Sequence, residues 1–176
     1  CMSNQIGVRV HTEPGAEVIL ERSAHILVYE GGGAAWLANA QLYPLTGCQG
    51  ALDPEEVRAS MRFGYYGQPK TTLLCLENTH NLAGGIPQPL SVTTPVTDVA
   101  REFDLNTHLD GARLWNAAIA LGTALPDLAA PFDAVSVCLS KGLGAPVGSC
   151  LVGSAEASTE ARRHRKRLGG GMRCLR

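Results

Sequence analysis

Lys141 is the residue whose position in this sequence most suggests covalent chemistry. It follows an apolar run from Asp133 to Leu139 and precedes the glycine-containing segment GLGAPVGS. An amine at the mouth of an apolar site loses solvation, and the neutral amine that results is a nucleophile. Glycines beside it let a planar ligand approach the backbone. When this stretch is considered alone, an exposed or phosphate-binding lysine is the simpler interpretation.

Asp110 and Arg113, in the segment HLDGAR, supply two further groups at the end of an apolar strand. A carboxylate at Asp110 suits a protonated ring nitrogen, and the Arg113 guanidinium suits bidentate binding of a carboxylate. The alternative is a helix N-cap with an i,i+3 ion pair. Asp110 and Lys141, each at a strand end, together fit pyridoxal phosphate, which needs a Schiff-base lysine and an acidic partner for its pyridine nitrogen.

Two of the five histidines, His25 and His80, supply groups that such a site still lacks. One of them would stack on a cofactor ring, and either would serve in proton transfer near neutral pH. For each of them alone, a hydrogen-bonded structural histidine is the alternative. We interpret His11, His108 and His164 as structural.

Short apolar strands alternate with helices along the chain, which predicts an α/β fold, a three-layer sandwich with a mostly parallel sheet. The expected strands cover 17–20, 72–76, the start of 105–122 and both sides of Lys141. Between them we expect a loop with His25, and helices after Gly33, from Pro54 with Asp53 as N-cap, at 95–104, after Asp110 and from 157.

Three polar clusters follow the ends of predicted strands. They are Glu77 to His80, Asp110 to Arg113, and Ser140 with Lys141. In a parallel sheet, ligands bind beyond the carboxyl ends of the strands. The three clusters are therefore expected to meet at one edge of the sheet.

Composition argues against several other classes of protein. A net charge of −1 gives no general attraction to nucleic acid or membranes, and no apolar run approaches the ~20 residues of a membrane span. The basic run RRHRKR is expected to be a solvated helix face or an oligomer contact. Three of the six cysteines lie in apolar runs and none forms a C-x-x-C pair, which is typical of buried, reduced thiols. We therefore expect a cytoplasmic protein without a metal site or disulfide framework.

Five segments, in order along the chain, carry a family resemblance. SAHILVYEGGG, LENTHN, HLDGARLWNAA, SKGLGAPVGS and RKRLGGGMR resemble the consecutive signatures of the L-threonine aldolases. These are pyridoxal-phosphate enzymes of fold type I, the aspartate aminotransferase type. The resemblance implies cleavage of L-threonine or L-allo-threonine to glycine and acetaldehyde, with a small amino acid as the substrate and pyridoxal 5'-phosphate as the cofactor.

The resemblance also implies a role for each matching residue. Lys141 would bind the cofactor covalently, Asp110 would pair with its pyridine nitrogen, and His25 would stack over its ring. Arg113 would hold the substrate carboxylate, and His80 would lie near the substrate hydroxyl. His80 or an ordered water would be the base. Arg173, in GGGMR, would reach a phosphate, in this family usually that of a neighbouring subunit.

Residues 1–176 are expected to form part of the cofactor-binding large domain, without the upstream phosphate loop or the C-terminal small domain. A full-length protein would form a homo-oligomer, a dimer or tetramer. Two alternatives remain open. The chain would be a catalytically incomplete fragment, or it would carry out another pyridoxal-phosphate reaction, such as β-elimination or transamination, on the same fold.

Overall fold

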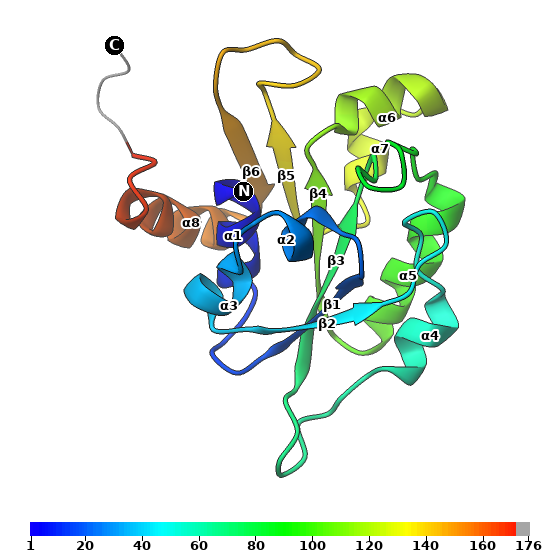
Figure 1. Cartoon of the computed structure of the whole chain (residues 1–176), viewed down its shortest axis with the longest axis vertical. Coiled ribbons are helices and arrows are strands. Elements are labelled where there is room, and N and C mark those ends of the chain that lie inside the picture. The colour runs from blue at the N-terminus through cyan, green and yellow to red at the C-terminus, as the bar shows by residue number, and fades with distance from the viewer. Residues whose placement is uncertain (172–176) are drawn as a thin grey trace.

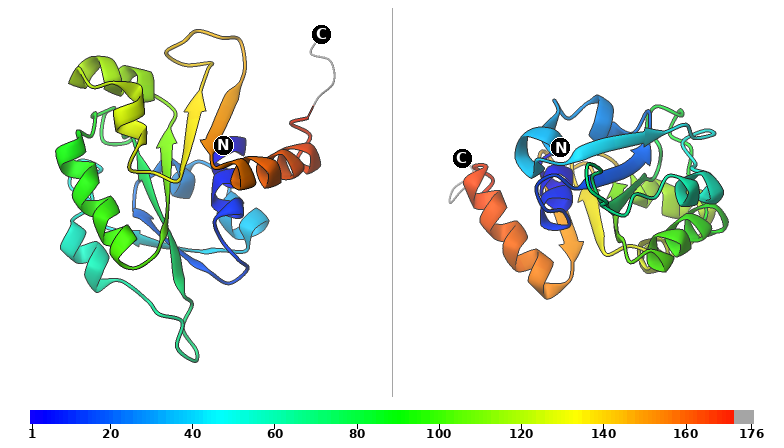
Figure 2. Two further views of the ribbon diagram at one scale, coloured as in Figure 1. Left: turned by 180° about the vertical axis from the view of Figure 1, so that it is seen from behind. Right: turned by 90° about the horizontal axis from the view of Figure 1, so that it is seen from below.

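The computed structural model describes residues 1–171, and these form a six-stranded sheet with helices on both faces (Figure 1, Figure 2). The strand order is β2-β1-β3-β4-β5-β6. The strands are β1 (Glu17–Glu21), β2 (Gln41–Leu45), β3 (Thr71–Glu77), β4 (Asn106–Gly111), β5 (Ala134–Cys138) and β6 (Ser149–Gly153). The helices are α1 (Met2–Val10), α2 (His25–Val28), α3 (Gly33–Ala38), α4 (Pro54–Ala59), α5 (Leu90–Glu102), α6 (Leu114–Leu121), α7 (Leu125–Ala129) and α8 (Ala155–Arg167).

The apolar core lies in two layers, one on each face of the sheet. Successive side chains of a strand point to opposite faces. Val18 and Leu20 of β1 accordingly pack with α1, α2 and α3, whereas Ile19 packs with α4 and α5. A third cluster joins β4 and β5 to α6 and α7. The predicted three-layer α/β sandwich is therefore confirmed.

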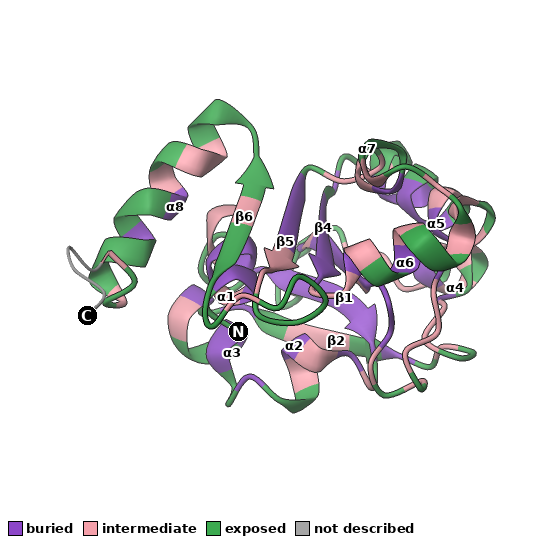
Figure 3. Cartoon of the chain, turned by 90° about the horizontal axis from the view of Figure 1, so that it is seen from above, coloured by how far each residue is buried: buried purple, intermediate pink, exposed green. Residues whose placement is uncertain are grey.

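Five strands, β1 to β5, run parallel, and β6 pairs with β5 in the antiparallel direction. As the edge strand, β6 has one paired side, and both it and α8 are largely exposed (Figure 3). Most of the basic run in α8 is exposed too, which agrees with a solvated helix face. None of the helices in the described part of the chain is long and apolar enough to cross a membrane.

Some local predictions are confirmed and others are wrong. Asp53 caps α4 by accepting the backbone N–H of Glu55 at 3.0 Å, as the sequence predicts. His25 does not lie in a loop but begins α2, because the Glu77 carboxylate accepts its backbone N–H at 2.7 Å. Three buried cysteines were expected, but of the five that the structure describes only Cys75 is buried. The expected apolar strand that contains Cys150 is the exposed edge strand.

The strand register brings the predicted polar clusters to one edge of the sheet. Glu77, near the end of β3, lies opposite Asp110 in β4, and Asp110 lies opposite Ser136 in β5. The loop that joins β5 to β6 carries Lys141 beyond the same strand ends (Figure 1). The carboxyl edge of the parallel strands is therefore where chemistry is expected.

Candidate active site

A cavity of about 200 Å³ lies at the carboxyl ends of β4 and β5. Three residues predicted from the sequence line it: Lys141, Asp110 and His25. Further polar groups around it come from α1 and β5, and they include Ser3, Asn4 and Ser136. The elements that build this cavity are thus far apart in the sequence and meet only in the folded sheet.

Asp110 is held firmly at the base of this cavity. It is 2% exposed, and its Oδ1 accepts the backbone N–H of Ala112 at 3.1 Å. Its Oδ2 accepts a hydrogen bond from Nδ2 of Asn4 at 2.7 Å. Both carboxylate oxygens are therefore fixed before any ligand binds, which favours recognition of a cation or a protonated ring nitrogen.

Lys141 reaches the cavity from an exposed loop. The prediction that it lies at the mouth of an apolar site is therefore wrong. The loop is closed by backbone hydrogen bonds from Gly144 to Lys141 and from Ala145 to Leu139. Gly144 has a φ of 70°, which glycine adopts without strain. The structure thus places the amine at the cavity by loop geometry, and the expected desolvation by an apolar mouth is absent.

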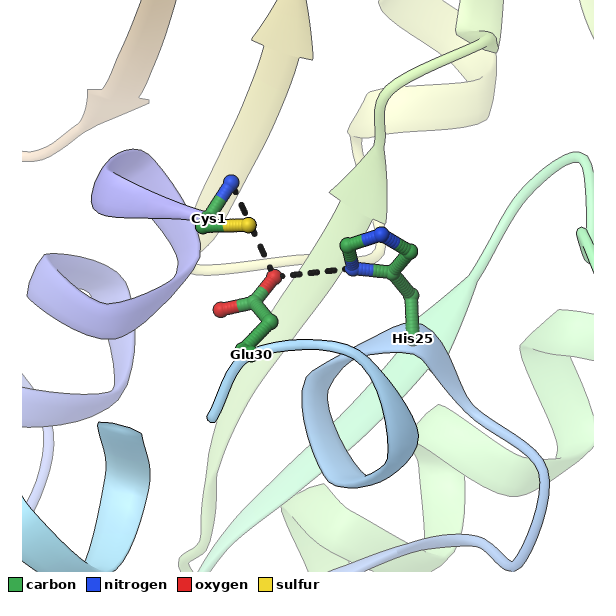
Figure 4. A group of neighbouring side chains, drawn as sticks. All are labelled: Cys1, His25 and Glu30. Carbon is green, nitrogen blue, oxygen red and sulfur yellow. Dashed lines mark hydrogen bonds and ion pairs between the residues drawn. The ribbon is translucent and has the colours of Figure 1, made fainter. Parts of the chain in front are cut away.

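His25 is oriented by two carboxylates. Glu77 fixes its backbone N–H, and Oε1 of Glu30 lies 3.0 Å from its ring Nδ1 (Figure 4). The side chain of Glu30 has no exposed surface, whereas that of His25 is 24% exposed. The imidazole therefore has one side anchored in the protein, while the residue also lines the cavity.

His80 is not among the residues that line the cavity. It is fully buried, its Nδ1 accepts the backbone N–H of Ala83 at 3.3 Å, and its Nε2 lies 3.2 Å from Oε2 of Glu21. Because its only acceptor nitrogen is already used by a backbone donor, the ring is held as an Nε2–H tautomer that faces a carboxylate.

Arg113 is not among the residues that line this cavity either. Its Nη1 donates to Oδ1 of Asn81 at 2.8 Å, beside the end of β3. The Asn81 backbone N–H in turn binds Glu77. Arg113 is thus tied to the same strand-end network as His25. The predicted phosphate ligand Arg173 lies outside the described residues.

Glu77 joins several of these groups. Its Oε1 accepts the backbone N–H of Asn81 at 2.9 Å, and its Oε2 accepts that of His25. Burial raises the pKa of this carboxyl above its ordinary value, although both hydrogen bonds oppose the shift. Glu77 was expected near the site only as part of a strand-end cluster, and its link to His25 could not be inferred from spacing.

Asn4, Glu30 and Ser136 were not singled out as site residues. Oγ of Ser136 lies 2.6 Å from Oγ of Ser3, which joins β5 to α1. For Ser136, a polar residue within a buried strand is the signal that could have identified it, and for Asn4 it is a polar residue in the first turn of a helix. Glu30 is different, since its carboxylate is buried only because the chain folds back after α2.

Three potential metal ligands lie close together at this site. Cys1, His25 and Glu30 each offer one ligand atom, and these atoms lie within 4.8 Å of one another (Figure 4). The contact between Nδ1 of His25 and Oε1 of Glu30 already explains why two of them are close. That the chain needs no metal stays a prediction.

Comparisons with known proteins agree with this architecture. The family model described as beta-eliminating lyase matches residues 1–175. The chain is 44% identical to low-specificity L-threonine aldolase 1 of Arabidopsis thaliana and 39% identical to the low specificity L-threonine aldolase of Escherichia coli K12. These matches cover 98% and 97% of the chain, but 49% and 51% of the relatives. The chain thus spans about half the length of the curated relatives it matches.

A solved structure gives independent support for the fold. The threonine aldolase of Leishmania major superposes with a TM-score of 0.82 at 22% identity, over 96% of this chain and 49% of that one. The predicted fold type and the resemblance to threonine aldolases are confirmed. Since the family model covers nearly every residue, the chain belongs to the beta-eliminating lyase family, whose threonine aldolases depend on pyridoxal phosphate.

Proposed function

We propose that the chain is the cofactor-binding part of a threonine aldolase, which cleaves L-threonine or L-allo-threonine to glycine and acetaldehyde. The observation that carries this proposal is that Lys141, Asp110 and His25, which come from three different segments, line one cavity. Relatives of the same family, named low-specificity L-threonine aldolases, support it.

The side chains around the cavity fit pyridoxal phosphate. The Asp110 carboxylate is buried and fixed by two N–H donors, so it would meet a protonated pyridine nitrogen without rearrangement. Lys141 would provide the amine that anchors the cofactor. The His25 ring would cover one side of the cofactor, and Arg173 would bind phosphate.

When bound, pyridoxal phosphate supplies an electron sink for negative charge at the substrate Cα. The protein residues would do the rest. Arg113 would bind the substrate carboxylate after exchanging Asn81 for it, and His25 would hold the reacting plane. Because the His80 ring is fully buried and its Nδ1 is occupied, we favour a water as the group that accepts the β-hydroxyl proton. His80 would then help to hold the strand end that carries the site.

Covalent attachment at Lys141 is the direct test. The protein would be incubated with pyridoxal 5'-phosphate, reduced with borohydride and digested, and the modified lysine would be identified by mass spectrometry. We expect modification at Lys141 and its loss in Lys141→Ala, with glycine formation from threonine lost as well. Lys166→Ala, on the exposed face of α8, is the matched control and should leave both intact. Attachment and turnover that survive in Lys141→Ala would refute the assignment.

β-Elimination is the second candidate reaction, and the description of the matching family favours it. The same lysine and aspartate would serve both reactions. Products separate them: aldehyde and glycine from threonine or allo-threonine indicate the aldolase reaction, whereas ammonia with pyruvate from serine indicates elimination. Transamination would consume a keto acid and release neither aldehyde nor ammonia.

We also propose that the complete protein is a homo-oligomer located in the cytoplasm. Several large apolar side chains are exposed, among them Trp36 at 74% and Ile119 at 85%. Exposed apolar side chains of this size are typical of surfaces that another chain or segment covers. Size-exclusion chromatography with light scattering of the complete protein would give the oligomeric state, and a monomer would exclude the assembly.

A further inference from the structure

Asn4 contacts two carboxylates at once. It is 3% exposed, and its Nδ2 donates to Oε1 of Glu30 at 2.8 Å and to Oδ2 of Asp110 at 2.7 Å. An amide nitrogen carries two hydrogens, so each carboxylate receives one. The two acids come from different elements, the end of β4 and the turn after α2. Asn4 is therefore the bridge that sets their separation.

The two acids determine which way the Asn4 amide points, because carboxylate oxygens accept and Nδ2 must therefore face them, which leaves Oδ1 toward His108. Nε2 of His108 lies 3.2 Å from Oδ1 of Asn4, and burial lowers the pKa of the imidazole to about 3, so the ring is neutral at physiological pH. Because Oδ1 can only accept, Nε2 of His108 carries the proton. The ring packs against Gly7, where an added Cβ would lie 2.4 Å from it. His108 thus provides the donor for Oδ1 of Asn4, and both ends of the amide are held.

Glu30 carries the effect of Asn4 to His25. Its Oε1 accepts the hydrogen bond of Asn4. The same oxygen lies 3.0 Å from Nδ1 of His25 (Figure 4). Without Asn4, two buried carboxylates would face each other with no shared donor, and buried like charges repel strongly. Both acids would then shift, and the ring of His25 would move with Glu30.

We infer that Asn4 is a positioning residue whose side-chain amide fixes the carboxylates of Asp110 and Glu30 and, through Glu30, the ring of His25. The inference rests on the proposed function in that Asp110 and His25 would contact pyridoxal phosphate. It adds a network of Asn4, His108 and Glu30 that prepares both contacts before the cofactor binds.

Asn4→Asp is the sharpest variant, because it keeps the shape and the acceptor for His108 but removes the donor to both acids. We expect its affinity for pyridoxal 5'-phosphate to fall about ten-fold or more, with a shifted absorption maximum of the bound cofactor. Adding Glu30→Gln returns one amide to the network and should recover part of both losses. Thr12→Val, in which a buried hydroxyl after α1 is removed, is the control and should change stability only.

Unchanged affinity and spectrum in Asn4→Asp would overturn the inference. Nitrogen-15 NMR of the imidazoles in cofactor-free protein gives a second readout, in which Asn4→Asp should displace the His25 signals and Thr12→Val should not. If the unaltered protein attaches no cofactor, the proposed function fails while this NMR comparison still decides the role of Asn4. If Asn4→Asp does not fold, Glu30→Gln replaces it, and unmoved His25 signals in that variant refute the network.

Discussion

Glu77 and His25 are joined by a hydrogen bond of 2.7 Å between the end of β3 and the first residue of α2. The acceptor is a buried carboxylate and the donor is a backbone N–H, so the link fixes the start of the helix and not only the side chain. Glu77 also accepts the backbone N–H of Asn81, which binds Arg113. One carboxylate thus holds two residues that the proposed reaction would use.

Replacing Glu77 with glutamine is expected to loosen both segments. The amide retains one acceptor oxygen, and its NH₂ would face a backbone N–H, so one half-buried donor loses its partner at a cost of about 1 kcal/mol. Urea unfolding should report this loss, and pyridoxal phosphate affinity should fall as well. Asp98→Asn, at an exposed ion pair of α5, is the control and should leave both measurements nearly unchanged. Equal stability and affinity in Glu77→Gln would contradict the role of this carboxylate.

The sequence predicted the parts of the fold that depend on local pattern. The alternation of apolar strands with helices correctly predicted the layered sheet. Asp53 followed by Pro54 correctly predicted where α4 begins. Strand ends gave the edge at which Asp110 and Lys141 meet, because parallel strands share one carboxyl edge. β2 was not predicted because it is an edge strand that is only partly buried, and Pro44 interrupts its apolar pattern.

Long-range polar contacts explain what sequence analysis could not give. His108 was interpreted as structural, and its ring is indeed buried, yet its position beside Asn4 depends on packing α1 against β4. Glu30 follows a short helix whose start is fixed by Glu77 from another strand. The prediction of an apolar mouth at Lys141 was wrong because β6 is an exposed edge strand, so the loop before it remains in solvent.

His108 is expected to make stability depend on pH in acid. Its folded pKa of about 3 lies below the ordinary value of 6.5, so between these values the unfolded chain binds a proton that the folded chain excludes. The stabilisation is complete above pH 6.5 and is lost as pH falls, by up to about 1.4 kcal/mol per pH unit. Urea unfolding of the unaltered protein and His108→Gln should give a difference that shrinks from pH 7 to pH 4. A difference independent of pH would show that the ring is accessible to protons.

Gly50 is expected to tolerate no side chain, because His80 occupies the space beside it. Its φ is 84°, and an added Cβ would lie 2.3 Å from the His80 ring. Gly15 has a similar φ of 87° but open space around it. Gly15→Ala should therefore cost about 1–2 kcal/mol from backbone strain alone, and Gly50→Ala clearly more. Urea unfolding of the two variants separates strain from packing, and equal losses would show that His80 can move aside.

The hydroxyl pair of Ser3 and Ser136 offers a direct measure of how α1 is attached to the cavity wall. Their oxygens are 2.6 Å apart and both residues are buried, so removing one hydroxyl leaves the other without this partner. Each single alanine variant should lose about 1 kcal/mol of unfolding free energy, and the double variant should lose less than the sum. A double-mutant cycle by urea unfolding measures the coupling. Strict additivity would mean that the two hydroxyls do not hold α1 against β5, and the position of Asn4 one residue later would then depend on its own contacts alone.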